Sequence, residues 1–202
     1  MNRRLTLITG IVLATISLLY LVGSVYRARS PFKVETLGEL YAPTLGQTGA
    51  PHSVVVFTDY RCPHCRVFEQ EVTPHLEALI ADGRLNLTLV PVAMVSEDSD
   101  LIAAGALCGA RQGDGVFVGL HRSLFDLPGV DVASLVDLGA QHGASPERLR
   151  GCLEGGKAAL EVEHNTVRAR ELGLRGTPTV VLEGKAYANP SWTRLEGVVG
   201  GR

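Results

Sequence analysis

Residues 53–65 read SVVVFTDYRCPHC, and this stretch decides the fold of the chain. Its first five residues are an apolar, β-branched run that is typical of a buried strand. A short connection then leads to Cys62-Pro63-His64-Cys65, and apolar residues recur at helical spacing as far as Ala81. Proline is favoured in the first turn of a helix, so the sequence predicts a strand, a turn carrying Cys62, and a helix.

The two cysteines of this turn have the spacing and the setting of a redox pair. A thiolate, not a thiol, carries out disulfide exchange, and the unpaired N–H groups and dipole at the start of a helix favour a negative sulfur at Cys62. A protonated His64 would stabilise that thiolate further. We therefore expect Cys62 to be the exposed nucleophile and Cys65 to be the covered, resolving thiol. A stabilised reduced form makes a strong oxidant, so the motif favours donating disulfides.

Other uses of a C-x-x-C pair are weaker interpretations of this sequence. A zinc site needs a second pair of ligands, and Cys108, Cys152, His121 and His142 do not show close metal-ligand spacing. A haem-attachment motif needs a histidine directly after the second cysteine, where this chain has Arg66. A purely structural disulfide stays open as an alternative. We expect no cofactor and no metal.

The rest of the chain predicts one sheet and a block of helices. Strands are expected at 85–90, 179–182 and 185–188, the last two forming a hairpin around Glu183-Gly184. Helical segments are expected between residues 99 and 172, and Asn189-Pro190 opens a last helix. Strands and helices that alternate in this way predict an α/β fold with one central sheet. Four histidines of the helices, namely His75, His121, His142 and His164, are expected to be solvated.

The N-terminus differs in composition from the remainder. An uncharged stretch of 22 residues, Leu5 to Tyr26, is flanked by Arg3, Arg4, Arg27 and Arg29. About 20 apolar residues span a bilayer as a helix, so residues 1–30 predict an uncleaved transmembrane anchor, with a cleaved signal as the alternative. Residues 31–50, which contain several Pro and Gly, predict a tether, and residues 51–202 the folded domain.

The overall composition narrows the function. The chain has 202 residues and a formal charge of −2, with no run of basic residues. Such a balance argues against binding to nucleic acid. The length is sufficient for a real hydrophobic core, so disulfides are not needed merely for folding.

The motifs together resemble the DsbA family of exported thiol:disulfide oxidoreductases. The resemblance runs over residues 51–190 and rests on the strand leading into Cys62-Pro63-His64-Cys65, on Pro74, which is expected to kink the next helix, on the helical block at about 97–170, and on 173–179, GLRGTPT. It implies a thioredoxin-like fold with an inserted helical subdomain. The helical block separates the chain from plain thioredoxin.

The same resemblance implies a set of functional features. Thr177-Pro178 is similar to the family's cis-proline loop, which would lie against the C-x-x-C turn and pair with a client peptide. The expected activity is oxidation of reduced, unfolded exported proteins by a membrane-anchored enzyme on the periplasmic or extracytoplasmic side. The expected partner is a quinone-linked membrane protein that reoxidises the enzyme.

Two departures from the family pattern bear on the mechanism. Family members often carry a buried acid on the strand before the motif, and Val54-Val55-Val56-Phe57 has none. Asp59 is the nearest acid; it either accepts a proton from Cys65 or caps the turn, and we favour the cap. Residues 27–50 are too short for the dimerisation region of the disulfide isomerase branch.

The remaining cysteines, Cys108 and Cys152, lie on expected helices of the inserted block. In an oxidising compartment we expect them to form a structural disulfide. Small buried apolar residues are the alternative, and a relay of electrons to Cys62 is a third.

Two further hypotheses compete with an oxidase. A membrane-anchored disulfide reductase would use the same cysteines in the opposite direction, and its reduction potential would lie near that of thioredoxin. A non-catalytic module would hold a client or a copper ion through Cys62 and Cys65 without turnover. Replacing Cys65 by alanine separates these classes, because only an exchange enzyme then traps clients through Cys62.

Overall fold

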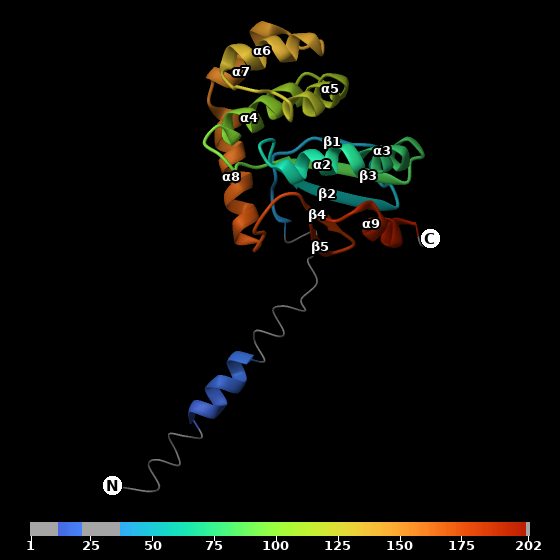
Figure 1. The fold of residues 1–202 in the computed structure, drawn as a ribbon, viewed down its shortest axis with the longest axis vertical. Helices are drawn as coiled ribbons and strands as arrows, with labels where there is room; N and C mark the ends of the chain where they lie inside the picture. The colour runs from blue at the N-terminus through green and yellow to red at the C-terminus, as the bar shows by residue number, and fades with distance from the viewer. Residues whose placement is uncertain (1–11, 22–36, 201–202) are drawn as a thin grey trace, which may run out of the picture. The chain divides into compact units, whose positions relative to one another are not determined.

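A computed structural model of the chain describes residues 12–21 and 37–200, as two separate parts. Residues 12–21 form a helix, and residues 37–200 form an α/β domain (Figure 1). Within these two ranges, no helix combines the length and the hydropathy that crossing a bilayer requires. Much of the predicted span from Leu5 to Tyr26 lies outside the described residues.

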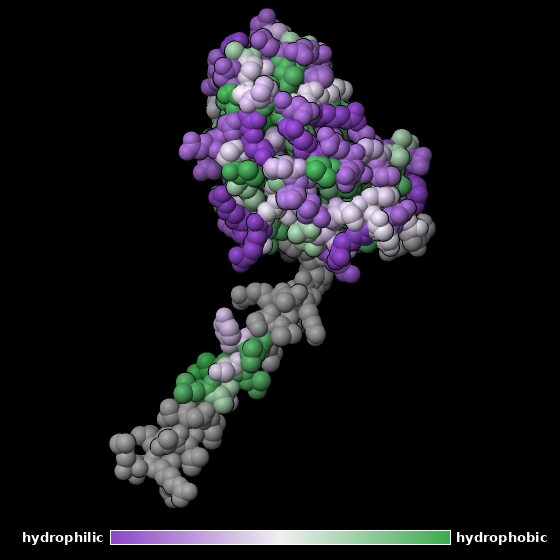
Figure 2. All heavy atoms as spheres, viewed as in Figure 1, coloured by the Kyte–Doolittle hydropathy of each residue, from purple (hydrophilic) through white to green (hydrophobic). Residues whose placement is uncertain are grey.

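The two parts differ in surface character. In the view of Figure 2 the helix of residues 12–21 is mostly hydrophobic, whereas hydrophilic side chains predominate over the face of the domain that the picture shows. Large apolar side chains are exposed along that helix: Val12, Leu13, Ile16, Leu18, Leu19 and Leu21.

The domain is built on a five-stranded sheet in the order β1-β3-β2-β4-β5. The strands are β1 (Thr44–Leu45), β2 (His52–Thr58), β3 (Leu85–Pro91), β4 (Thr179–Leu182) and β5 (Lys185–Ala188). Strand β2 runs parallel to β3, and the other neighbouring strands are antiparallel. The mixed sheet and the element order are those of the thioredoxin-like fold that the sequence predicted.

The apolar run of the opening stretch becomes the central strand. β2 has neighbours on both edges, with Val54 facing Leu87 of β3 and Leu182 of β4. Val54, Val56 and Phe57 are at most 2% exposed. A strand covered on both faces must be apolar almost throughout, which explains the sequence of this segment.

The helix after the motif is interrupted where the sequence predicted a kink. Helix α2 (Pro63–Glu71) ends at Val72, and α3 (Thr73–Ala81) begins directly after it. Pro74 lies in the first turn of α3, where its missing N–H leaves no bond unmade. Phe68 of α2 and Leu76 of α3 are both buried in the hydrophobic core.

The inserted block consists of helices α4 to α8, between β3 and β4. They are α4 (Ser99–Ala110), α5 (Asp114–Leu124), α6 (Val132–Gln141), α7 (Pro146–Glu154) and α8 (Lys157–Glu171). Helix α4 packs against the other four, and α8 runs back to contact β3 (Figure 1). Ser145 caps α7 as predicted, since its side chain accepts from the backbone N–H of Arg148.

The C-terminal part follows its sequence signals closely. Glu183 and Gly184 take φ values of 49° and 70°, which is the pattern of a two-residue hairpin turn between β4 and β5. Helix α9 (Trp192–Val199) then completes the domain and buries Leu195 and Val199.

The predicted tether needs a correction for residues 37–50. Leu37 is buried, β1 pairs with β3, and the backbone of Tyr41 exchanges hydrogen bonds of 2.8 and 3.0 Å with the side chain of Asn165. This segment therefore belongs to the domain. A strand of two residues is too short to show a periodic pattern in the sequence. Its position depends on pairing with a strand that is distant in the sequence.

Candidate active site

Cys62 occupies the junction between the central sheet and helix α2. It is the N-cap residue of that helix, with φ −81° and ψ 118°, and Pro63 opens the first turn. The backbone N–H of Cys62 donates to Asp59 O at 3.0 Å, and those of Cys65 and Arg66 donate to Cys62 O. The sulfur-bearing residue is therefore held at the positive end of the helix dipole.

The cis-proline loop lies against the motif. The Thr177-Pro178 peptide bond is cis, as the resemblance implied, and the Cys62 thiol donates to Thr177 O at 3.1 Å. The Thr179 hydroxyl donates to Gly176 O, and Pro178 O accepts from Asn189 N–H at 2.8 Å. These bonds fix the loop, so the fold brings together two segments that are 115 residues apart in sequence.

The exposure of the two cysteines differs from the prediction. Both are free thiols. Cys65 is 1% exposed, as expected for the covered thiol, but Cys62 is only 7% exposed. The expectation of an open Cys62 was wrong because the loop that contains Thr177 covers its sulfur, and linear sequence does not reveal that contact.

Burial decides the acidity of Cys65. Burial is the main reason that the pKa of this thiol rises from 9.0 to about 12, and a negative charge on Cys62 contributes to that rise. The neighbouring polar groups of Thr177, Asp59 and Thr58 oppose the rise without cancelling it. Cys65 is thus a thiol that keeps its proton at neutral pH.

Pro63 and His64 lie between the two cysteines and are both exposed. Their place in the first turn of α2 is the predicted one. The electrostatic effect of His64 on the Cys62 sulfur stays a prediction.

Asp59 has the capping role favoured from the sequence. It is fully buried, and each carboxylate oxygen accepts two hydrogen bonds: Oδ1 from Arg61 N–H and the Ser99 hydroxyl, and Oδ2 from the N–H groups of Met94 and Val95. These bonds measure 2.7 to 3.0 Å. The carboxylate therefore joins the active-site loop to the start of the inserted block.

Two arginines beside the motif hold the loop that follows α5. Arg61 donates to Leu127 O at 2.6 Å and to Asp98 Oδ2 at 2.9 and 2.5 Å. Arg66 donates to Phe125 O. Because these bonds reach backbone carbonyls, they fix the main chain of that loop against the C-x-x-C turn.

His121 is a buried residue that the sequence interpretation placed in solvent. It is 3% exposed, and its Nδ1 lies 2.8 Å from the hydroxyl of Tyr60. Phe117 and Phe125 pack against its ring. The signal was present, since residues 117, 121 and 125 are spaced by four and share one helical face.

The second cysteine pair is bonded. Cys108 of α4 and Cys152 of α7 form a disulfide with an S–S distance of 2.03 Å, closing a sequence separation of 44. The pair lies within the inserted block and joins two of its helices. In the described ranges, no group of three or more His, Cys, Asp or Glu side chains is placed to hold a metal ion.

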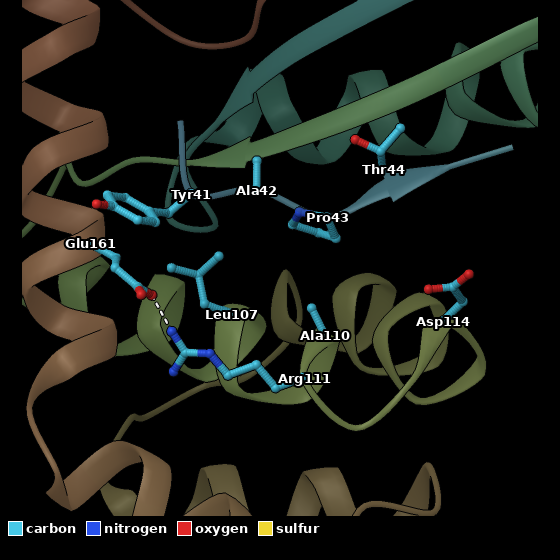
Figure 3. Close-up of a pocket in the computed structure, with 9 residues that line it drawn as sticks. All are labelled: Tyr41, Ala42, Pro43, Thr44, Leu107, Ala110, Arg111, Asp114 and Glu161. Carbon is cyan, nitrogen blue, oxygen red and sulfur yellow. Dashed lines mark hydrogen bonds and ion pairs between the residues drawn. The ribbon is translucent and has the colours of Figure 1, made fainter. Parts of the chain in front are cut away.

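A cavity of about 330 Å³ lies on a different part of the domain (Figure 3). The segment Tyr41 to Thr44 forms one wall, and α4, α5 and α8 form the other. An ion pair between Arg111 and Glu161 crosses it. Neither Cys62 nor Cys65 lines this cavity, so it is separate from the redox pair.

The domain that carries the two cysteine pairs matches a known protein family. Residues 39–200 match the thioredoxin family. The chain belongs to the thioredoxin family. The match covers the domain from the segment before β1 to the end of α9, so it includes the inserted helices.

Similar proteins support the DsbA-like resemblance. The chain is 26% identical over 203 residues to "probable disulfide bond formation protein D" of Bacillus anthracis, covering 94% of this chain and 93% of that protein. It is 28% identical over 159 residues to disulfide bond formation protein D of Bacillus subtilis, covering 73% and 70%.

Oxidised BdbD from Bacillus subtilis has a similar crystal structure, with a TM-score of 0.73 and 23% identity over 85% of this chain and 95% of that one. At that identity the likeness concerns the fold. Together with the sequence matches, it confirms the prediction of a DsbA-like thiol:disulfide oxidoreductase.

Proposed function

We propose that this protein is a dithiol oxidase that donates the Cys62–Cys65 disulfide to reduced, exported proteins. The observation that carries the proposal is the contrast between the two sulfurs. Cys62 caps helix α2 and touches the cis-proline loop, whereas Cys65 is buried and its pKa is raised to about 12. A thiolate formed at Cys62, at the start of helix α2, would be stabilised more than one at the buried Cys65. A reduced pair stabilised in this way makes the disulfide oxidising.

The catalytic cycle begins with the disulfide form. A client thiolate attacks Cys62, the Cys62–Cys65 bond breaks, and Cys65 leaves with the electron pair. A second client thiolate then attacks the client sulfur of the mixed disulfide, which releases Cys62 as a thiolate. Cys62 is the better leaving group because the start of α2 and His64 stabilise its charge.

The cis-proline loop would position the client during this exchange. Thr177 O accepts from the Cys62 thiol in the reduced protein. That proton is absent when Cys62 is a thiolate or is bonded to a client, so Thr177 O is then free to accept an N–H of the client backbone. Pairing of an extended peptide in this way gives affinity without demanding a particular sequence.

A membrane anchor and a membrane partner complete the proposal. The helix of residues 12–21 exposes large apolar side chains, and the uncharged stretch in the sequence is 22 residues long. We propose that it anchors the domain on the extracytoplasmic side, near a quinone-linked protein whose disulfide reoxidises Cys62 and Cys65. Retention of the full chain in membranes after alkaline carbonate washing, and its loss without residues 1–30, would test the anchor.

The direction of exchange is tested by a redox equilibrium with glutathione. An oxidase should have a potential well above about −270 mV, the value of thioredoxin, and should oxidise a reduced peptide with two cysteines. A potential near that of thioredoxin would contradict the oxidase proposal and would indicate a disulfide reductase.

Trapping then tests catalysis itself. The Cys65→Ala variant, with Cys62 first converted to its mixed disulfide with oxidised glutathione, should exchange onto reduced peptides, release glutathione and accumulate mixed disulfides between Cys62 and the peptide. A Cys62→Ala, Cys65→Ala variant should accumulate none. A Cys65→Ala protein that binds peptides or copper without forming mixed disulfides would instead be a binding module.

A further inference from the structure

A second cavity, of about 420 Å³, lies between the end of α8 and the segment that follows β3. Its lining residues are Met94, Arg170, Gly173, Leu174 and Arg175. Two of them carry a guanidinium group, and no carboxylate of the described residues lines the cavity. The hollow is therefore positively charged. Cys62 does not line it, so its relation to the redox pair depends on the segments that form its walls.

Both walls of this cavity connect to Cys62. On one side, the backbone N–H of Met94 donates to Asp59 Oδ2 at 2.7 Å, and Asp59 O accepts from Cys62 N–H at 3.0 Å. On the other side, Arg175 precedes Thr177 by two residues, and Thr177 O lies 3.1 Å from the Cys62 sulfur. Two residues of chain span at most about 7 Å. The cavity is therefore within reach of a peptide whose cysteine has reacted with Cys62.

The turn between Arg170 and Arg175 is fixed by backbone hydrogen bonds. Gly173 N–H donates to Arg170 O at 2.9 Å, and Leu174 N–H donates to Ala169 O at 3.0 Å. These two bonds form a Schellman motif, and Gly173 has the φ of 78° that the motif requires. Leu174 is 8% exposed and holds the turn against the core. The main chain that carries the two arginines is thus well supported.

The two guanidinium groups have no counterion of their own. Both arginines are exposed, and in the described part of the chain neither Arg170 nor Arg175 forms an ion pair or a side-chain hydrogen bond. Glu171, the nearest acid in sequence, pairs instead with Arg168 at 2.9 Å. Glu163 borders a neighbouring cavity together with Arg170 but forms no ion pair with it. An anion that enters the charged cavity would therefore meet two available donors.

The chemistry of the lining favours a carboxylate. A guanidinium group is planar and always charged, and its N–H groups match the two oxygens of a carboxylate. Arg170 also lies in the last turn of α8, where a positive charge interacts favourably with the helix dipole. That structural role accounts for Arg170 alone. It explains neither Arg175, which lies beyond the helix, nor the hollow between the two side chains.

We propose that this cavity binds the carboxylate of an aspartate or glutamate in the client, within about three residues of the cysteine that bonds to Cys62. The inference rests on the proposed thiol–disulfide exchange at Cys62. A client held at Thr177 O brings its neighbouring side chains to the cavity at a high local concentration, which a free anion lacks. Arg170 and Arg175 then select among clients and take no part in the exchange of electrons.

The direct test compares reduced peptides that differ only in charge. Each peptide carries two cysteines in a Gly-Ser background, with Glu, Gln or Lys at the three positions before each cysteine, or at the three positions after it in a second set. In one set, the wild-type protein should oxidise the Glu peptide about fivefold faster than the Gln peptide, and the Lys peptide more slowly still. Equal initial rates in both sets, below saturation, would overturn the proposal.

Two uncharged reagents separate binding of the carboxylate from effects on the sulfur atoms. A carboxylate makes a nearby peptide thiol less acidic, so each rate is divided by the rate of the same peptide with hydroxyethyl disulfide. Reduction of the Cys62–Cys65 disulfide by dithiothreitol should differ less than twofold between the wild type and Arg170→Gln, Arg175→Gln. A loss with dithiothreitol as large as that with the Glu peptide would mean that the arginines act on Cys62, which would contradict the proposal.

Reversal of the two charges gives the sharpest variant. Arg170→Glu, Arg175→Glu should oxidise the Lys peptide about fivefold faster than the Glu peptide. Partial unfolding would slow all peptides alike, so it cannot reverse their order. A variant that still prefers the Glu peptide would overturn the proposal. If the double variant does not fold, Arg175→Gln alone should lower the wild-type preference at least twofold, and an unchanged preference would have the same meaning.

A matched control is available on α7 of the inserted block. Arg148 and Arg150 are exposed on that helix, so Arg148→Glu, Arg150→Glu changes the net charge by the same amount away from the cavity. This variant should keep the wild-type preference for the Glu peptide. A reversal as large as that of Arg170→Glu, Arg175→Glu would assign the preference to the overall charge of the domain and would contradict the proposal.

Salt completes the test and needs no variant. The preference of the wild type should shrink in 0.5 M sodium chloride, because exposed charges are screened at that concentration. A preference that salt does not change would contradict a carboxylate site. These measurements also separate the two proposals. A protein that oxidises none of the peptides fails as an oxidase, whereas a protein that oxidises the Glu and Gln peptides equally well fails only here.

Discussion

The two cysteine pairs of this domain share a residue type and differ in almost everything else. Cys62 and Cys65 are free thiols three positions apart at the start of a helix. Cys108 and Cys152 are bonded across 44 positions between two helices of the inserted block. Burial does not separate the pairs, since Cys62, Cys65 and Cys108 are all less than 10% exposed.

The difference lies in what surrounds each sulfur. Cys62 is the N-cap residue of α2, and its thiol donates to the carbonyl of Thr177. Cys108 is surrounded by packed apolar helices, and Cys152 meets the guanidinium of Arg111 at 3.0 Å. A disulfide that closes a long loop stabilises the fold, whereas one that closes a single helical turn is open to exchange.

The largest expected effect separates the pairs by activity. Cys62→Ser should lower the rate of peptide oxidation at least about 1,000-fold, because a hydroxyl cannot exchange with a disulfide. Cys108→Ser, Cys152→Ser should retain activity within a few-fold. The initial rate of oxidation of a fluorescent dithiol peptide tests both variants. Equal losses of activity in the two variants would contradict the different roles of the two cysteine pairs.

A second prediction concerns the acidity of Cys65. With a pKa of about 12 in place of 9.0, Cys65 at pH 8 should have a thiolate fraction about 1,000-fold smaller than an ordinary thiol. Iodoacetamide should therefore modify Cys65 in the Cys62→Ser variant only very slowly until the pH approaches 12. Mass spectrometry of the alkylated peptide gives the rate, and rapid labelling at pH 8 would contradict the prediction.

The same shift links stability to pH. Folding raises the pKa of Cys65 from 9.0 to about 12, so the folded protein favours the protonated thiol. The contribution of this thiol to the free energy of unfolding is therefore complete below about pH 9 and is lost as the pH rises toward 12. Urea unfolding of the reduced protein should show a steeper loss of stability over that range than unfolding of a Cys65→Ala control.

A third prediction measures the structural pair. Cys108→Ser, Cys152→Ser should lower the free energy of unfolding by about 2–4 kcal/mol, because the unfolded chain regains the freedom that the closed loop had removed. Urea unfolding with circular dichroism gives the value. A variant as stable as the wild type would mean that the bond is not a structural support.

The smallest expected effect concerns the arginine beside that pair. Arg111→Met removes the cation that pairs with Glu161, whose side chain is only 9% exposed. Glu161 then keeps only the more distant Lys157, whose Nζ lies 3.9 Å from its carboxylate, as a partner among its described ion pairs. We expect a loss of about 1–2 kcal/mol in stability and no change in peptide oxidation. Thermal unfolding and the peptide assay test the two halves of this prediction.

Sequence reasoning succeeded where local chemistry determines the structure. The β-branched run before the motif, the proline after it, Ser145 at the start of α7 and the Glu183-Gly184 turn each encode a local geometry. The C-x-x-C motif with a distant Gly-Thr-Pro predicted the fold because each half has its own recognisable pattern.

The errors share one cause, which is contact between segments distant in sequence. β1 is held by β3, Cys62 is covered by the loop at Thr177, and His121 is buried by Tyr60. None of these contacts has a local signature. The helical spacing of residues 117, 121 and 125 marked a face, but the sequence did not show that the active-site loop would cover it.

The arginines on either side of the motif have a consequence for protein engineering. Arg61 and Arg66 bind backbone carbonyls of Leu127 and Phe125, which belong to the loop between α5 and α6. The inserted helices are therefore not a detachable accessory. A chimera that transplants residues 61–66 into a minimal thioredoxin would leave both guanidinium groups without these backbone acceptors, so the motif with its flanking arginines and the insertion must be transferred together.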